Sequence, residues 1–184
     1  MLVVYGGAFN PPTLAHFNIA KSLIDYFEPD LFYFLPVGDK YKKEDLVLFS
    51  HRFNMVEFLS NKLNAFVSNI ENKEEVLGTY YTLSELSNVD KDIYFVIGAD
   101  NLAKLSKWKN SEKLINEFKF IVLTREGYDV DLILNEQFFD FKNNFIEFDI
   151  NIDISSSDYR KTKNSSILLD EVYQYIVENN LYLE

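Results

Sequence analysis

The sequence contains no cysteine and only two histidines, His16 and His51. Without cysteine the chain cannot form disulfides, use a thiolate nucleophile or bind a metal through sulfur. Two histidines are also too few for a metal site built from several imidazoles. We therefore expect no metal ion held by protein side chains.

Glycine and proline are scarce, with 6 and 4 residues, which argues against a disordered or fibrous chain. Long hydrophobic runs are missing as well, since Ile93–Ala99 and Phe118–Leu123 are far too short to cross a bilayer. The first residues, MLVVYGGAF, carry no basic segment of the kind that opens a secretory signal. At 184 residues we expect a soluble cytoplasmic protein with one domain, residues 1–184.

Positive charge is in short supply, with 18 basic against 29 acidic residues and a formal net charge of −11. A protein that binds nucleic acid through its phosphates normally carries a basic face, so nucleic acid is not expected as a partner. A small anionic ligand is still compatible with this charge, because a few local cations and helix N-termini can hold a triphosphate.

Short apolar runs alternate with segments of helical spacing along most of the chain. The expected strands are Leu2–Tyr5, Leu31–Pro36, Ala65–Ile70, Ile93–Gly98, Phe118–Leu123 and Phe145–Phe148. The expected helices are Thr13–Tyr26, Ser50–Asn64, Tyr80–Ser87, Ser111–Glu117, Ser155–Lys161 and Leu168–Asn179. This pattern predicts an α/β fold with a doubly wound parallel sheet and helices on both faces. Residues 129–144 are the least legible, and we expect variable surface there.

The strongest motif is GGAFNPPTLAH, from Gly6 to His16, because it joins a buried strand to the start of a helix. Two glycines allow the backbone to approach a ligand closely. The N–H groups and positive dipole end of the helix that begins near Thr13 face the same space. His16 lies one turn into that helix, where an imidazole can donate a hydrogen bond to a phosphate in the transition state. The motif predicts a phosphate site.

A second motif, ISSSDYRK from Ile154 to Lys161, lies near the other end of the chain. Serines at a helix start both cap the helix and present hydroxyl and N–H groups to an anion. Arg160, about a turn later, can add a forked cation for phosphate oxygens. Nothing local explains why both motifs occur in one domain, so together they favour one phosphate-binding function.

Both motifs resemble signatures of the nucleotidyltransferase superfamily, whose glycine loop reads Gly-Gly-x-Phe-Asp-Pro before (His/Thr)-x-Gly-His. The match departs from the pattern at Asn10, where Asp is common, and at Ala15, which replaces Gly. The resemblance implies a Rossmann-like sheet. Within the superfamily, FVIGADNL (Phe95–Leu102) followed by Trp108 is similar to the bacterial nicotinate-mononucleotide adenylyltransferases. In that family the Asp contacts the nucleotide and the Trp region packs on the pyridine ring.

Further segments carry the same resemblance. They are LPVGDKYKK (Leu35–Lys43), HRFNMVEF (His51–Phe58), GTYYTLSEL (Gly78–Leu86) and TREGYD (Thr124–Asp129). We expect His51 and Arg52 to be structural. Lys43 aligns best with a phosphate-binding lysine of the family, while Lys40 and Lys42 remain open alternatives. Trp108 has the alternative interpretation of covering a sheet edge.

By position, the resemblance assigns sites residue by residue. It implies catalytic roles for His16, Thr13 and Arg160. It implies ATP or phosphate binding by Gly6, Gly7, Ala8, Phe9, Lys43, Gly98, Asp100, Ile154, Ser155 and Ser156. It implies pyridine nucleotide binding by Thr79, Tyr80, Trp108 and Arg125.

The activity implied by the resemblance is transfer of AMP from ATP to nicotinate mononucleotide, a step of NAD biosynthesis, with release of pyrophosphate. Mg²⁺ is expected to accompany ATP, held mainly by phosphate oxygens and water. Three alternatives stay open: nicotinamide mononucleotide as the acceptor, another phosphorylated acceptor such as phosphopantetheine, and a catalytically silent nucleotide-binding protein. The sequence does not decide whether the chain forms a homo-oligomer.

Overall fold

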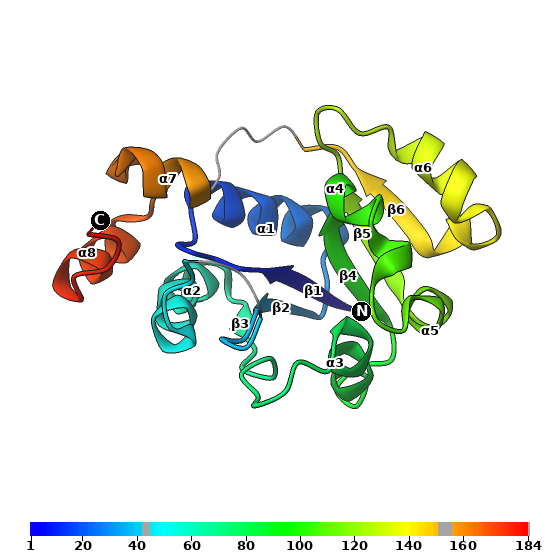
Figure 1. Cartoon of the computed structure of the whole chain (residues 1–184), viewed down its shortest axis with the longest axis horizontal. Coiled ribbons are helices and arrows are strands. Elements are labelled where there is room, and N and C mark those ends of the chain that lie inside the picture. Colours follow the sequence, from blue (N-terminus) through cyan, green and yellow to red (C-terminus); the bar gives the residue numbers. More distant parts are fainter. Residues whose placement is uncertain (42–44, 151–155, 184) are drawn as a thin grey trace. The chain divides into compact units, whose positions relative to one another are not determined.

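We describe a computed structural model of the chain for residues 1–41, 45–150 and 156–183 (Figure 1). Its strands are β1 (Leu2–Gly7), β2 (Leu31–Pro36), β3 (Phe66–Val67), β4 (Ile93–Gly98), β5 (Lys119–Leu123) and β6 (Phe145–Phe148). Its α-helices are α1 (Leu14–Phe27), α2 (Phe49–Leu63), α3 (Thr79–Leu86), α4 (Ala99–Leu102), α5 (Ser111–Glu117), α6 (Val130–Gln137), α7 (Ser156–Thr162) and α8 (Asp170–Glu178). The 3₁₀ helices of the described residues are η1 (Leu105–Lys107), η2 (Phe139–Asn144) and η3 (Ser165–Ile167).

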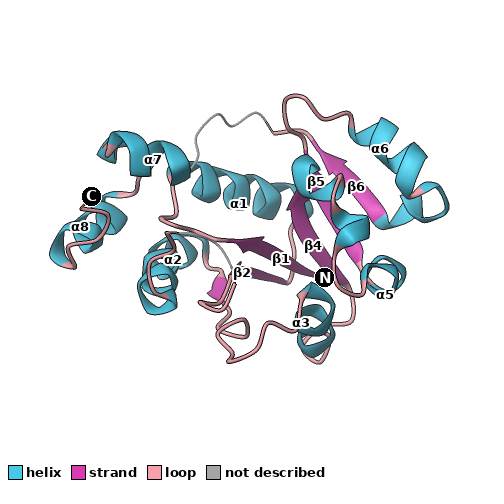
Figure 2. Cartoon of the chain, viewed as in Figure 1, coloured by secondary structure: helices cyan, strands magenta, loops and turns pink. Residues whose placement is uncertain are grey.

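The strands form a parallel sheet with the order β3-β2-β1-β4-β5-β6, flanked by helices (Figure 2). Val4 pairs with Phe95, and Phe95 pairs with Phe120, so the register runs through apolar residues. Strands β1, β4 and β5 are β-branched and aromatic and mostly buried, as expected for parallel strands covered on both faces. The predicted α/β class with a parallel sheet is therefore confirmed.

By contact density the chain divides into two compact units. The first unit holds residues 1–6, 29–31 and the described residues from 77 to 150. Its core is built on β1, β4 and β5, where Val3, Val4, Phe120 and Ile121 are fully buried. The prediction that residues 1–184 form one domain stays a prediction.

The second unit holds residues 7–28, 32–76 and the described residues from 156 to 183. Helix α1 follows Thr13 and ends where Glu28 adopts the left-handed conformation with φ 43°. Helix α8 packs beside α2 (Figure 1), and the strongly amphipathic α8 buries Val172 and Ile176. This unit contains Gly7–His16 of the first motif and residues 156–161 of the second.

Two expectations about elements were wrong. Residues 129–144 are not simply surface, because they form α6 and η2 and bury Val130, Leu134 and Phe138. The third strand is much shorter than Ala65–Ile70, since only Phe66 and Val67 pair with β2. Phe66 is half exposed, and β3 is the outermost strand of the sheet. The apolar run Ala65–Ile70 therefore did not indicate a buried strand. Among the described residues, no helix is long and apolar enough to span a membrane.

Candidate functional site

The glycine loop leaves β1 at Gly7 and contains a fully buried aromatic side chain. Phe9 is 0% exposed, has a φ of 47° and packs edge-on against His16 and Phe34. A Cβ on Gly7 would lie 2.9 Å from the Phe9 ring, and a Cβ on Gly6 would lie 2.9 Å from Phe95. The glycines are therefore required first by the packing of these rings. A nucleotide could contact Phe9 only through its backbone, because the side chain is fully buried.

His16 is held by the residue that caps its helix. The backbone N–H of Thr13 donates to His16 Nδ1 over 3.0 Å, and the Thr13 hydroxyl lies 2.9 Å from the same nitrogen. Because Nδ1 accepts a hydrogen bond, the proton of the neutral imidazole is on Nε2. Thr13 is buried, so in this structure its hydroxyl orients His16.

Burial also decides the charge of His16. Desolvation lowers the pKa of its imidazole from 6.5 to about 4. At neutral pH the side chain is therefore an uncharged Nε2–H donor. An uncharged donor can stabilise charge that develops on a phosphate oxygen without itself transferring a proton.

The second motif lies against the first. Ser156 Oγ donates to the carbonyl oxygen of Pro11 over 2.8 Å. Arg160 Nη1 donates to the carbonyl oxygen of Asn10 over 2.6 Å, and its Nη2 donates to Ser157 Oγ over 3.2 Å. Residues near 10 and near 160 are thus joined directly. Three predicted phosphate-site residues, Lys43, Ile154 and Ser155, lie outside the described residues.

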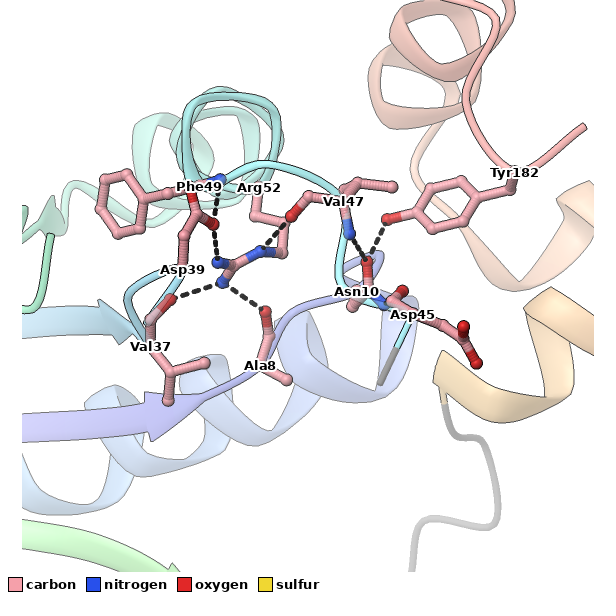
Figure 3. Close-up of polar contacts among 9 residues, drawn as sticks. All are labelled: Ala8, Asn10, Val37, Asp39, Asp45, Val47, Phe49, Arg52 and Tyr182. Atoms are coloured by element: carbon pink, nitrogen blue, oxygen red, sulfur yellow. Dashed lines mark hydrogen bonds and ion pairs between the residues drawn. The ribbon is translucent and has the colours of Figure 1, made fainter. Parts of the chain in front are cut away.

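A buried guanidinium supports this loop from the other side (Figure 3). Arg52 is 0% exposed and donates to the carbonyl oxygens of Ala8, Val37 and Val47 at 3.1, 2.7 and 2.8 Å. Its Nη2 also lies 3.0 Å from a carboxylate oxygen of Asp39. Burial lowers the pKa of Arg52, and the Asp39 carboxylate opposes that shift. The expected structural role of Arg52 is borne out by these contacts.

The sequence did not predict that the amide of Asn10 is buried and connects separate segments of the chain. It also missed Tyr182, whose hydroxyl donates to Asn10 Oδ1 over 2.8 Å (Figure 3). The unusual residue at position 10 was itself a signal that its partners differ from the common pattern. No local pattern pointed to Tyr182, which lies 172 positions away along the chain.

In the first unit, two predicted ligand residues pair with each other. Arg125 Nη1 lies 3.2 Å from Asp100 Oδ1, with the side chains 61% and 27% exposed. A Cβ on Gly98 would lie 2.6 Å from the same carboxylate oxygen, so a larger residue there would displace the Asp100 carboxylate from this position. Burial raises the pKa of Tyr5, and the nearby Arg125 opposes the shift. The unit thus carries an ion pair just after β4.

The predicted pyridine residues of this unit do not all offer their side chains. Helix α3 begins at Thr79, after Gly78 with φ 98°. The Tyr80 hydroxyl donates to the Glu117 carboxylate at 3.1 and 3.2 Å, so a ligand contact at position 80 falls to its backbone. The Trp108 ring packs edge-on against Phe95 with centroids 6.4 Å apart, and it is partly exposed. Both interpretations of Trp108 are compatible with this position.

Across residues 1–41, 45–150 and 156–183, no three His, Asp or Glu side chains are grouped so that they could hold a metal ion. In the same residues, every buried polar side-chain atom has a hydrogen-bond partner.

Comparison with known proteins shows the family of the chain. Residues 4–162 match the model of the cytidylyltransferase-like family. The chain is 42% identical, over its whole length and 98% of the relative, to a probable nicotinate-nucleotide adenylyltransferase of Acholeplasma laidlawii. It is 31% identical to a protein of the same description from Clostridium acetobutylicum, covering 98% of each chain. Among solved structures, nicotinic acid mononucleotide adenylyltransferase of Plasmodium falciparum, complexed with NaAD, aligns with a TM-score of 0.83 at 25% identity, covering 100% of this chain and 98% of that one.

Proposed function

The chain belongs to the nicotinate-nucleotide adenylyltransferases of the cytidylyltransferase-like family, and from that premise we propose that it transfers AMP from ATP to nicotinate mononucleotide. The products are the deamido dinucleotide and pyrophosphate. The relatives of this description match the chain from end to end. The family and the activity predicted from the sequence therefore agree with the comparisons.

The observation that carries the site assignment is the junction of the two motifs. Arg160 and Ser156 donate to the carbonyl oxygens of Asn10 and Pro11, which lie six and five residues before His16 in the chain. A guanidinium and a neutral imidazole donor are thereby held at one loop, and because the Ser156 hydroxyl gives its proton to Pro11, a phosphate contact at position 156 would use its backbone N–H. These groups suit a triphosphate, since a guanidinium and N–H or O–H donors are the usual phosphate ligands.

The reaction needs few catalytic groups. An oxygen of the acceptor phosphate forms a bond to the α-phosphorus of ATP, and the bond from that phosphorus to the β-phosphate bridging oxygen breaks. Both the nucleophile and the leaving group are ionised phosphates, so no general base is required. We assign to His16 Nε2–H a hydrogen bond to the reacting phosphate, and to Arg160, Ser156 and Ser155 the stabilisation of the departing pyrophosphate.

Other roles follow from the resemblance. Asp100 and Gly98 would contact the nucleotide, and Trp108 with Arg125 and the backbone of Thr79 and Tyr80 would bind the pyridine nucleotide. The lysine that contacts phosphate, Lys43 in our assignment, lies outside the described residues. Because Asp100 and Arg125 pair in this structure, binding of a nucleotide by either group competes with their ion pair.

We propose Mg²⁺ as the divalent ion and a cytoplasmic location, where ATP and its acceptor are available. The described residues offer no group of three carboxylate or imidazole ligands. That donor set fits an ion bound through phosphate oxygens and water, which is how Mg²⁺ commonly binds in such sites. The ion would neutralise phosphate charge during transfer.

The deciding experiment measures pyrophosphate release from Mg-ATP with nicotinate mononucleotide, nicotinamide mononucleotide and phosphopantetheine offered separately, beside a His16→Ala variant. We expect release with the nicotinate form, and a large loss in the variant. Release with only nicotinamide mononucleotide, or with only phosphopantetheine, would identify that compound as the acceptor in place of nicotinate mononucleotide. Binding of ATP without release with any acceptor would identify a nucleotide-binding protein and contradict the proposed activity.

A further inference from the structure

The Asn10 side chain joins three segments of the second unit (Figure 3). It is 2% exposed. Its Nδ2 donates to the carbonyl oxygen of Asp45 over 2.7 Å, and its Oδ1 accepts from the backbone N–H of Val47 over 3.2 Å. The same Oδ1 accepts from the Tyr182 hydroxyl over 2.8 Å. The amide therefore has one donor contact and two acceptor contacts, and its position depends on all three.

An amide fits this position better than the Asp that is common in the family. A carboxylate has no proton to donate, so it would place a charged oxygen against the Asp45 carbonyl oxygen at 2.7 Å. The Tyr182 hydroxyl and the Val47 N–H could bind either side chain. Asn10 thus belongs together with its particular partners in this chain.

The main chain of Asn10 carries the link to the proposed phosphate ligands. Its carbonyl oxygen accepts from Arg160 Nη1 over 2.6 Å, and the next carbonyl, of Pro11, accepts from Ser156. A shift of residue 10 therefore moves the anchor of the Arg160 guanidinium. The side-chain contacts of Asn10 and the position of Arg160 are coupled through one residue.

Tyr182 is itself firmly placed. It adopts a left-handed φ of 58°, its ring packs edge-on against Tyr159 with centroids 5.9 Å apart, and Lys163 donates to its carbonyl oxygen. Burial raises the pKa of its phenol, while the positive charges of Arg160 and Arg52 oppose the shift. The hydroxyl is therefore a neutral donor throughout the physiological range.

We propose that Tyr182 is a positioning residue for the phosphate site: its hydroxyl fixes Asn10, and Asn10 in turn fixes the Arg160 guanidinium that binds the triphosphate. The assignment rests on the proposed function of Arg160. It gives the turn after α8 a role in ATP binding, although no atom of Tyr182 needs to touch the nucleotide.

The test is a double-mutant cycle with wild type, Tyr182→Phe, Arg160→Ala and the double variant. The first readout is the dissociation constant of Mg-ATP by calorimetry, without an acceptor. We expect Tyr182→Phe to weaken Mg-ATP binding by about 5-fold, as for loss of one neutral hydrogen bond. In the Arg160→Ala background the same change should alter binding by less than about 1.5-fold, because coupled residues are not additive.

A merely structural role for Tyr182 predicts a different result. Loss of general stability would weaken binding equally in both backgrounds, and that additive outcome, or no weakening at all, overturns the proposal. The matched control is Tyr26→Phe, a loss of a hydroxyl at a side chain 70% exposed at the other end of α1. It should leave Mg-ATP binding unchanged, and unfolding midpoints of all variants establish that each is folded at the assay temperature.

Turnover with nicotinate mononucleotide gives the second readout. In Tyr182→Phe we expect KM for ATP to rise by about the same 5-fold, with KM for the acceptor within about 2-fold of wild type. Absence of turnover in wild type would contradict the proposed function alone, since the binding cycle still decides the role of Tyr182. A rise confined to KM for the acceptor overturns the positioning role.

Discussion

The Nδ1 atom of His16 accepts a hydrogen bond from the backbone nitrogen of Thr13 at 3.0 Å, which places the imidazole proton on Nε2. Burial lowers the pKa of the ring to about 4, so the donor is neutral under physiological conditions. Thr13 therefore contributes to the site chiefly by selecting the tautomer and the direction of its neighbour. The imidazole is suited to hydrogen bonding and not to proton transfer.

Removing this donor should slow the chemical step strongly. We expect His16→Ala to lower kcat by about 10²- to 10³-fold, the usual effect of losing one preorganised donor to developing negative charge. The loss should fall on kcat more than on KM, because the donor acts mainly in the transition state. Pyrophosphate release at saturating Mg-ATP and nicotinate mononucleotide measures it.

The only other histidine of the chain provides a matched control. His51 Nδ1 lies 3.0 Å from the Tyr175 hydroxyl, in the contact between α2 and α8. His51→Ala should therefore reduce stability by about 1 kcal/mol and leave kcat within about 3-fold of wild type. Equal losses of kcat in the two variants would rule out a specific role for His16.

Stability should depend on pH through the same histidine. His16 has a pKa of about 4 in the folded chain and 6.5 as its ordinary value. Between these values the unfolded state binds more protons, so the contribution of His16 to stability is complete above pH 6.5 and is lost as the pH falls towards 4. We expect this contribution to be about 3 kcal/mol.

Urea unfolding of wild type and His16→Ala at several pH values between 7.5 and 4 isolates the effect, because carboxylate titrations are common to both proteins. The gap in unfolding free energy between them should narrow as the pH falls. A constant gap would mean that the imidazole titrates near its ordinary pKa in the folded chain.

Much of the fold was predictable because its strands are short, apolar and bounded by turn residues. The strands Leu31–Pro36, Ile93–Gly98 and Phe145–Phe148 agree residue for residue with the structure. Helix α6 was missed although a signal was present. The Asp129 carboxylate caps the helix by accepting from Leu132 N–H, and Val130, Leu134 and Phe138 follow at helical spacing.

The site was predictable only where its residues form local motifs. His16 and Arg160 belong to two recognisable strings, and Arg160 of the second string donates to the carbonyl oxygen of Asn10 in the first. The hydrogen bond between Tyr182 and Asn10 could not be predicted, because the partners of a buried amide are determined by the tertiary structure. Sequence likewise did not show that the Tyr80 hydroxyl would bind Glu117 on α5.

Arg52 should be more important for stability than any exposed cation. Its guanidinium is fully buried and satisfies three carbonyl oxygens besides Asp39. We expect Arg52→Met to cost about 3 kcal/mol of unfolding free energy, because those acceptors lose their donor inside the protein. Urea denaturation measures the loss.

Arg125→Met is the control for charge alone, since Arg125 is 61% exposed and pairs with Asp100. Its cost should stay below about 1 kcal/mol, as for exposed ion pairs. Comparable costs for the two variants would show that the buried contacts of Arg52 add nothing to stability.

The fluorescence of Trp108 can distinguish binding of the pyridine ring from simple packing on the sheet, because Trp108 is the only tryptophan of the chain. If the pyridine ring stacks on the indole, nicotinate mononucleotide should quench the emission by more than about a third at saturation, because an electron-poor ring takes up close contact with the indole. Trp108→Phe should then raise KM for the acceptor by about 3- to 10-fold, with KM for ATP unchanged, as expected for loss of one aromatic contact.

An indole that only packs against Phe95 on the sheet predicts the opposite pattern: no quenching by the acceptor, unchanged KM values and a lower unfolding midpoint in Trp108→Phe. Emission of the variant with ligand added corrects for tyrosine and for absorption by the nucleotide.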